Sequence, residues 1–70
     1  MIYRVSYRGV HDGEQHRDFE VSSEKEALEA FDFAVGRQAT GIIMLQRLVE
    51  GYCQSLSRFR RDDQDRWIRL

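Results

Sequence analysis

Hydrophobic and polar positions alternate at the start of the chain. In residues 2–8, Tyr3, Val5 and Tyr7 fall on one side of an extended backbone and polar side chains fall on the other. Alternation with a period of two is typical of a strand that buries one face. Residues 15–21 alternate in the same way toward their end, so the pattern predicts a second strand.

A hairpin is predicted to join these two strands. The Asp12-Gly13 pair marks the turn. A three-residue loop at 12–14 would place Val5 opposite Val21, which keeps apolar side chains together on one face. The same register would pair Tyr7 with Phe19 on that face, and Arg8 with Asp18 on the solvent side.

One helix is predicted after the hairpin. Ser23 and Glu26 form a capping box, with Ser23 as the N-cap and Glu26 reaching back. The helix is expected to end near Val35, with Gly36 as the residue that follows it. The apolar stripe of this helix, expected to face the core, consists of Leu28, Phe31 and Val35, flanked by Ala27 and Ala34.

The second half of the chain predicts three more strands. Residues 40–49 are the most hydrophobic stretch and read as a central strand that is covered on at least one face. Glu50-Gly51 is a turn, and residues 52–60 form the next strand. A polar loop at 61–65 then leads to a short last strand at 66–70.

The predicted order of elements is therefore ββαβββ, an α+β fold in a single domain, residues 1–70. Short β–β connections favour antiparallel pairing, so we expect a five-stranded antiparallel sheet with one helix packed on one face. Strict alternation in the fourth strand predicts Tyr52 and Leu56 on one face, and Cys53 and Phe59 on the other.

Composition narrows the class of protein. The chain has 70 residues with 41% hydrophobic and 33% charged residues, which is typical of a folded soluble domain. No apolar run is long enough to span a membrane, and residues 1–5 do not resemble a signal peptide. A single cysteine, Cys53, excludes an intramolecular disulfide. We expect a protein of the cytoplasm.

Charge is distributed unevenly along the chain. The formal net charge is −1, but residues 1–36 hold four basic and eight acidic side chains, whereas residues 37–70 hold seven basic and four acidic ones. Such polarity suits a charged partner. It equally suits a fold in which the two halves neutralise each other.

Residues that carry chemistry are few. His11 and His16 lie near the first hairpin without a zinc-binding spacing, and Cys53 has no activating base suggested by the sequence. No phosphate-binding glycine loop or catalytic triad can be read. The sequence predicts that the protein is not an enzyme and that it holds no catalytic residue, metal or cofactor.

Two surface features are candidates for partner binding. One is an arginine-rich C-terminal hairpin with interleaved aromatic residues, and the other is an aromatic on the outer side of the helix, roughly 140° around from Leu28 at about 100° per residue. The candidate partner-binding residues are Phe33, Arg37, Arg58, Arg60, Arg61, Arg66 and Trp67.

The order of elements and two short segments resemble small phage-encoded anti-CRISPR proteins that inhibit type I CRISPR surveillance complexes (Cascade). The matching positions are Gly41, Ile43 and Met44 in the central strand, and Phe59, Arg60, Asp62, Arg66, Trp67 and Ile68 at the end of the chain.

This resemblance implies a stoichiometric inhibitor that binds Cas proteins of a type I Cascade and blocks recognition of target DNA in the cytoplasm of a bacterial host cell. Two other functions remain open at this point. The arginine-rich hairpin could bind nucleic acid in a phage or bacterial accessory protein, although the pI of about 6.1 disfavours this. The chain could also be a small dimeric adaptor, so both a monomer and a homodimer are considered.

Overall fold

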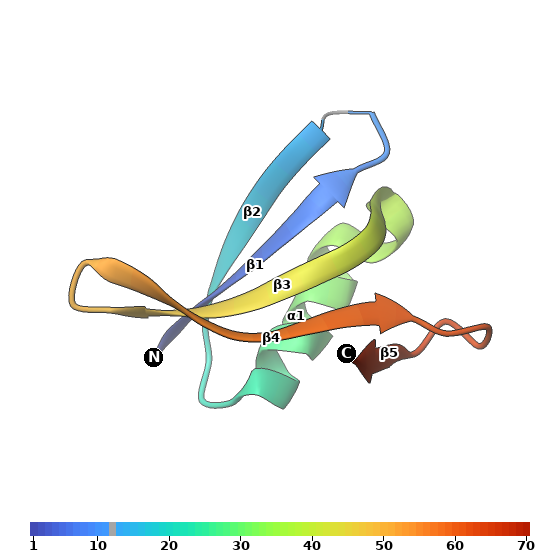
Figure 1. The fold of residues 1–70 in the computed structure, drawn as a ribbon. Helices are drawn as coiled ribbons and strands as arrows, with labels where there is room; N and C mark the ends of the chain where they lie inside the picture. The colour runs from blue at the N-terminus through green and yellow to red at the C-terminus, as the bar shows by residue number, and fades with distance from the viewer. Residues whose placement is uncertain (12) are drawn as a thin grey trace.

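The computed structural model describes residues 1–11 and 13–70, and of residue 37 only the backbone. It contains one antiparallel sheet with strand order β2-β1-β3-β4-β5, crossed on one face by a single α-helix (Figure 1). The predicted α+β fold and the order ββαβββ are thereby confirmed. The elements are β1 Ile2–Gly9, β2 Gly13–Glu20, α1 Glu24–Val35, a 3₁₀ turn η1 Gly36–Gln38, β3 Ala39–Val49, β4 Tyr52–Arg61 and β5 Trp67–Arg69.

The capping box starts the helix as predicted. The Ser23 hydroxyl accepts a hydrogen bond from the backbone N–H of Glu26, and the Glu26 carboxylate accepts one from the N–H of Ser22. These contacts satisfy two donors near the start of the helix. The helix ends at Gly36, whose φ of 62° is accessible to glycine without strain and whose N–H bonds the carbonyl of Asp32.

The core lies between the helix and the sheet. Phe31, Ile43, Leu45 and Val5 have the largest fully buried side chains. Phe31 meets the ring of Tyr7 edge-on, with centroids 5.2 Å apart. Of the predicted helix stripe, Ala27, Phe31 and Val35 are buried and Leu28 is half-buried, but Ala34 is exposed, which corrects its assignment to the core.

The register predicted for the first hairpin is wrong by four positions. Val5 lies opposite Arg17, and Gly9 lies opposite Gly13. Gly13 is therefore the first residue of β2 and does not belong to the loop in which it was expected. Gly13 has a φ of 76°, the left-handed conformation that commonly closes a three-residue hairpin loop. The Asp12 half of the predicted turn lies outside the described residues.

A bulge in β4 overturns the predicted faces of that strand. Leu45 pairs with Ser57 but Gln46 pairs with Ser55, so Leu56 is an extra residue on β4. An extra residue inverts the alternation beyond it. Cys53 and Phe59 therefore lie on opposite faces, and Leu56 packs against the core with Phe59.

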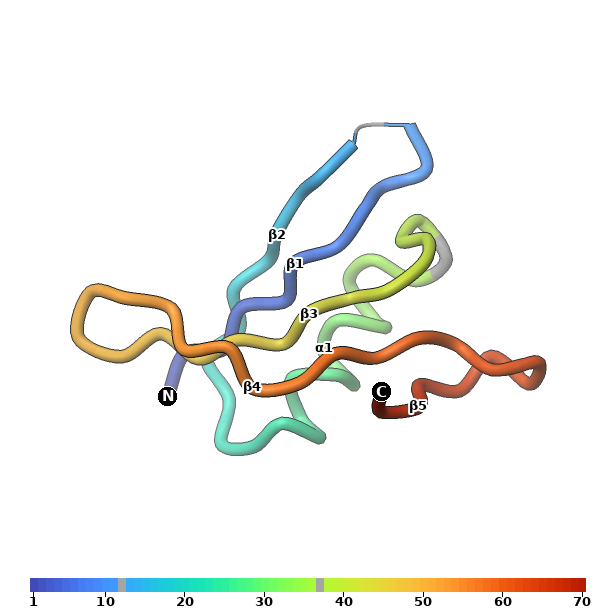
Figure 2. The backbone as a smooth tube through the Cα atoms, in the orientation of Figure 1, coloured from blue at the N-terminus to red at the C-terminus, as the bar shows by residue number. Residues whose placement is uncertain are grey.

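The β3–β4 hairpin projects beyond the rest of the sheet (Figure 2). Its two-residue turn, Glu50-Gly51, was predicted, and both residues have positive φ, 43° and 92°. These values match the primed turns that suit the twist of antiparallel strands. No helix in the described part of the chain is long and apolar enough to cross a membrane.

Candidate functional site

The two faces of the sheet differ because only one is covered. The helix covers one face, and the opposite face of β1–β4 is left to solvent; we call it the open face (Figure 1). On β1 the alternation is clear, since Tyr3, Val5 and Tyr7 are buried while the side chains between them are not. The side chains of the open face include Arg4, Ser6, Arg8, Glu14, His16, Asp18, Ile42, Met44, Arg58 and Arg60.

Arg61 and Trp67 of the predicted partner-binding set lie on the helix side of the sheet. The guanidinium of Arg61 stacks over the Trp67 ring at 4.1 Å and donates hydrogen bonds to Asp32 Oδ1 (2.9 Å) and to the carbonyl of Gly36 (3.0 Å). Trp67 Nε1 donates to the same Asp32 oxygen at 2.7 Å, and its ring packs against Phe31. Together these contacts tie the last hairpin to the end of the helix.

Arg66 is exposed but already paired. Its Nε donates to Asp62 Oδ2 at 3.1 Å, while Asp62 Oδ1 accepts hydrogen bonds from the backbone N–H groups of Arg66 and Gln64. These backbone donors, with the nearby guanidinium, hold the pKa of Asp62 below its usual value. Asp62 and Arg66 therefore shape the loop between β4 and β5.

Arg58 and Arg60 extend from the open face. Arg58 lies beside Met44 on the neighbouring strand, and Arg60 lies beside Ile68. Neither guanidinium forms an ion pair or hydrogen bond with any residue that the structure describes. Arg8, on β1 of the same face, likewise has no partner for its guanidinium within residues 1–11 and 13–70.

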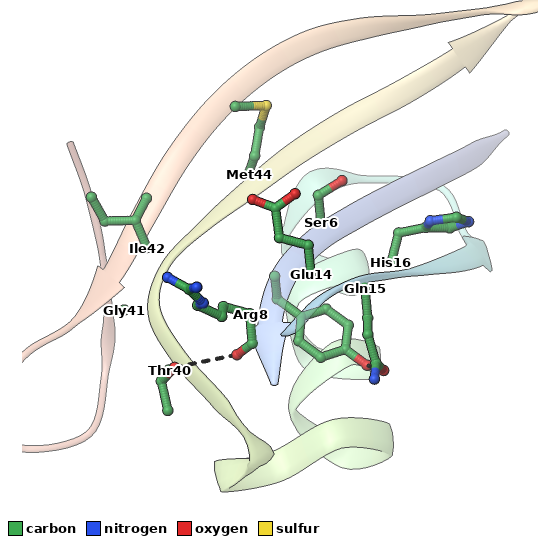
Figure 3. Close-up of a pocket in the computed structure, with 10 residues that line it drawn as sticks. Ser6, Arg8, Glu14, Gln15, His16, Thr40, Gly41, Ile42 and Met44 are labelled. Carbon is green, nitrogen blue, oxygen red and sulfur yellow. Dashed lines mark hydrogen bonds between the residues drawn. The ribbon is translucent and has the colours of Figure 1, made fainter. Parts of the chain in front are cut away.

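A groove of roughly 910 Å³ runs over the β1, β2 and β3 part of the open face (Figure 3). A bulge in β3 shapes it: Ser6 pairs with Met44 but Arg8 pairs with Thr40, so Tyr7 alone spans three residues of β3. Gly41 lies in this bulge with a φ of 71°, a conformation that a side chain disfavours. The residues that line the groove are Ser6, Tyr7, Arg8, Glu14, Gln15, His16, Thr40, Gly41, Ile42 and Met44.

Exposed apolar side chains lie beside these arginines on the open face. Ile42 is 51% exposed and Leu70 is 53% exposed, and Met44 borders one hollow with each of them. A second hollow of about 340 Å³ lies where β5 ends against β4. It is lined by Met44, Ser55, Leu56, Ser57, Arg58 and Leu70.

Phe33, the candidate partner-binding residue on the helix, faces away from the open face. Phe33 is 96% exposed and points outward from α1, so it lies on the opposite side of the molecule from Arg58 and Arg60. The side chain of Arg37 lies outside the described part of the chain. The predicted partner-binding side chains that the structure describes thus occupy separate places: the open face, the helix side of β4 and β5, the loop between these two strands, and the outer side of the helix.

Arg4 and Asp18 on the open face neutralise each other. Arg4 forms a two-pronged pair with Asp18, which lowers the pKa of that carboxyl, and also donates to Cys53 Sγ at 3.5 Å. Within the described residues, no three histidine, cysteine or acidic side chains are grouped as a metal site. His16 lines the groove, and His11 is exposed in the hairpin loop.

Sequence reasoning missed Arg8, Ile42, Met44 and Leu70 as candidates for binding. Arg8 and Ile42 are polar and apolar residues in ordinary strand positions, and nothing in their spacing marks them. The available signal was Gly41 inside an otherwise hydrophobic strand, which is typical of a bulge or a close approach.

Comparison of the chain with protein-family models found no match, and comparisons with curated proteins and with solved structures found no significant similarity.

Proposed function

We propose that this chain is a protein-binding inhibitor, without catalytic activity, that acts by occupying a surface of a larger protein. The observation that supports this is the open face, where exposed Ile42 and Met44 stand beside Arg58 and Arg60, whose charges no described residue neutralises. Apolar side chains beside arginine are typical of interface centres, because the aliphatic surface is removed from water while guanidinium groups pair across the contact.

The partner proposed is a type I CRISPR surveillance complex, in which the inhibitor blocks recognition of target DNA. Its support is the resemblance of the sequence to anti-CRISPR proteins, at Gly41, Ile43 and Met44 and along the last hairpin. Met44 also belongs to the open face, so part of the resemblance and the exposed surface coincide.

A protein partner is favoured over a nucleic acid for two reasons. Single-stranded nucleic acids bind by stacking bases on aromatic side chains, and no exposed side chain of the described open face is aromatic. Furthermore, three arginines of the last hairpin are already engaged, Arg61 by Asp32, Arg66 by Asp62 and Arg69 by the Ser57 hydroxyl. Too few free cations remain there to track a phosphate backbone.

The test is co-elution on size exclusion with purified type I Cascade complexes, with and without bound target DNA. Co-elution with the DNA-free complex alone is the expected result. Co-elution in both states would contradict competition with DNA, and failure with several subtypes would contradict Cascade as the partner. A shift of free DNA or RNA at about 50 mM salt would favour nucleic-acid binding instead.

A charge-reversed pair locates the surface. Arg58→Glu with Arg60→Glu should abolish co-elution, because both groups lie on the open face and have no structural partner. The matched control is Arg17→Glu with Lys25→Glu, which makes the same change in net charge at exposed positions on the helix side. Loss of binding in both variants would indicate a general charge effect and contradict the assignment to the open face.

A further inference from the structure

The outer edge of β4 is paired along only part of its length. β4 runs from Tyr52 to Arg61, but β5 pairs with Phe59, Arg60 and Arg61 alone. One further backbone bond continues this contact, from the N–H of Leu70 to the carbonyl of Arg58 at 2.9 Å. From residue 52 to residue 57, no strand of the described chain lies on the outer side of β4.

This free edge differs from the other edge of the sheet. β2 forms the opposite edge, and five of its eight residues can carry charge: Glu14, His16, Arg17, Asp18 and Glu20. Charged side chains along an edge strand discourage pairing with another chain. Residues 52–57 of β4, Tyr-Cys-Gln-Ser-Leu-Ser, contain neither a charged residue nor a proline. The β4 edge therefore lacks the charges that protect β2, and the bulge at Leu56 is its one irregularity.

A hollow lies at the same place. The 340 Å³ hollow is bordered by Ser55, Leu56 and Ser57 of the free edge, and by Leu70, where β5 ends. A strand added along β4 in line with β5 would run past this hollow. Its side chains would project on the open face toward Met44 and Arg58.

The lining indicates the chemistry of the added strand. Met44, Leu56 and Leu70 offer apolar contact, and the unpaired guanidinium of Arg58 offers a cation. An apolar side chain and a carboxylate two positions apart on an incoming strand project on the same face and would satisfy both. A second copy does not fit through its own β4 edge, because its free segment, 52–57, carries no acidic residue, and its β2 edge carries the charges that discourage pairing.

We infer that the free edge of β4, residues 52–57, binds an extended acidic and apolar segment of the partner protein as an added strand. In this mode the main-chain hydrogen bonds supply affinity, and the pocket for alternate side chains supplies specificity. The inference rests on the proposed function, since it requires a protein partner.

The first experiment selects peptides against the folded protein from a library of random linear peptides displayed on phage. Enriched sequences should carry an acidic and an apolar residue two positions apart, so that both side chains project on the same face of the strand. Bound peptide should slow amide hydrogen exchange, measured by NMR, within residues 52–57 and not along β2. Enrichment of no peptide, or protection at β2 alone, would overturn the inference. Protection of 52–57 that grows with protein concentration, without peptide, would assign the edge to a second copy and overturn it as well.

Matched variants separate the edge from general surface effects. Leu70→Glu should abolish peptide binding, since it puts a negative charge in the hollow, whereas Val10→Glu should leave it unchanged. Both residues are 53% exposed, and both backbone N–H groups keep their bonds to backbone carbonyls. Arg58→Ala should weaken binding about tenfold, the effect of losing one hydrogen bond to a charged group, and Arg17→Ala should not. Equal losses within either pair would contradict the site.

The same variants distinguish this inference from the proposed function. If the protein co-elutes with Cascade and Leu70→Glu leaves that co-elution intact, the inhibitor function stands and the added strand is wrong. If no Cascade complex binds but acidic peptides protect residues 52–57, Cascade is the wrong partner and the strand-binding edge stands.

Discussion

Arg60 and Arg61 are neighbours in the sequence, yet they belong to different parts of the molecule. Because side chains alternate along a strand, Arg60 lies on the open face and Arg61 lies on the helix side. No described residue forms an ion pair or hydrogen bond with the guanidinium of Arg60. On the helix side, Arg61 is held between Trp67, Asp32 and the end of the helix, and its side chain is only 20% exposed. This arginine-rich segment therefore interleaves arginines that stabilise the fold with arginines whose guanidinium groups have no partner among the described residues.

Removing Trp67 should have the largest effect on the structural side of this comparison. Trp67→Ala would delete a ring that packs on Phe31 and supports Arg61, and would leave the Asp32 carboxylate with one donor fewer. We expect a loss of about 3 kcal/mol in the free energy of unfolding, at the low end for a tryptophan because this ring is only half-buried. Urea denaturation measures it, and a loss under about 1 kcal/mol would show that the last hairpin contributes little to the fold.

The two neighbouring arginines give the sharpest test. Arg61→Ala should cost about 2 kcal/mol, since it removes hydrogen bonds to Asp32 and to the Gly36 carbonyl in a half-buried place. Arg60→Ala is the matched control and should change stability by less than about 0.5 kcal/mol. Both midpoints come from the same urea titration. Equal effects of the two substitutions would contradict the division of β4 into a structural and a free side.

The sequence predicted this division incompletely. The strands, the helix and its caps follow from alternation, the Ser23 capping box and Gly36, because these signals are local. The faces of β4 did not follow, because the bulge at Leu56 depends on how β4 pairs with β3, and a Ser-Leu-Ser segment carries no sign of it. Without the bulge, Cys53 and Phe59 share a face; with it, Cys53 lies beside Arg4 on the open face.

The hairpin register failed for a related reason. Pairing Val5 with Val21 assumes that apolar residues always lie opposite each other, but β2 is an edge strand. At an edge, a long side chain such as that of Arg17 can cover apolar surface and still reach water, so Val5 opposite Arg17 is tolerated. The candidate site was predicted in part: Arg58 and Arg60 were among the residues named, whereas the groove required the bulge at Gly41.

Acidification should weaken the loop that supports the structural side. Asp62 has a lowered pKa in the folded protein because it accepts hydrogen bonds from Arg66 and Gln64, so folding favours its charged form. Its contribution to stability is present above the unfolded pKa of about 4 and is lost as the pH falls through the lower folded value. Urea midpoints of wild type and Asp62→Asn should differ at pH 7 and converge below about pH 4. A difference that grows on acidification would contradict this account.

Substitution of Phe33, on the outer side of the helix, should have the smallest effect on stability. It tests whether the binding surface is the open face or the helix. Its side chain is 96% exposed, so Phe33→Ser removes almost no buried surface, and the two residues have similar helix propensities. The free energy of unfolding should change by less than about 0.5 kcal/mol. Co-elution with the partner should also survive, because Phe33 points away from the open face that carries Arg58 and Arg60. If Phe33→Ser abolished co-elution without changing stability, the binding surface would have to be assigned to the helix instead of the sheet. The unpaired arginines of the open face would then need another explanation.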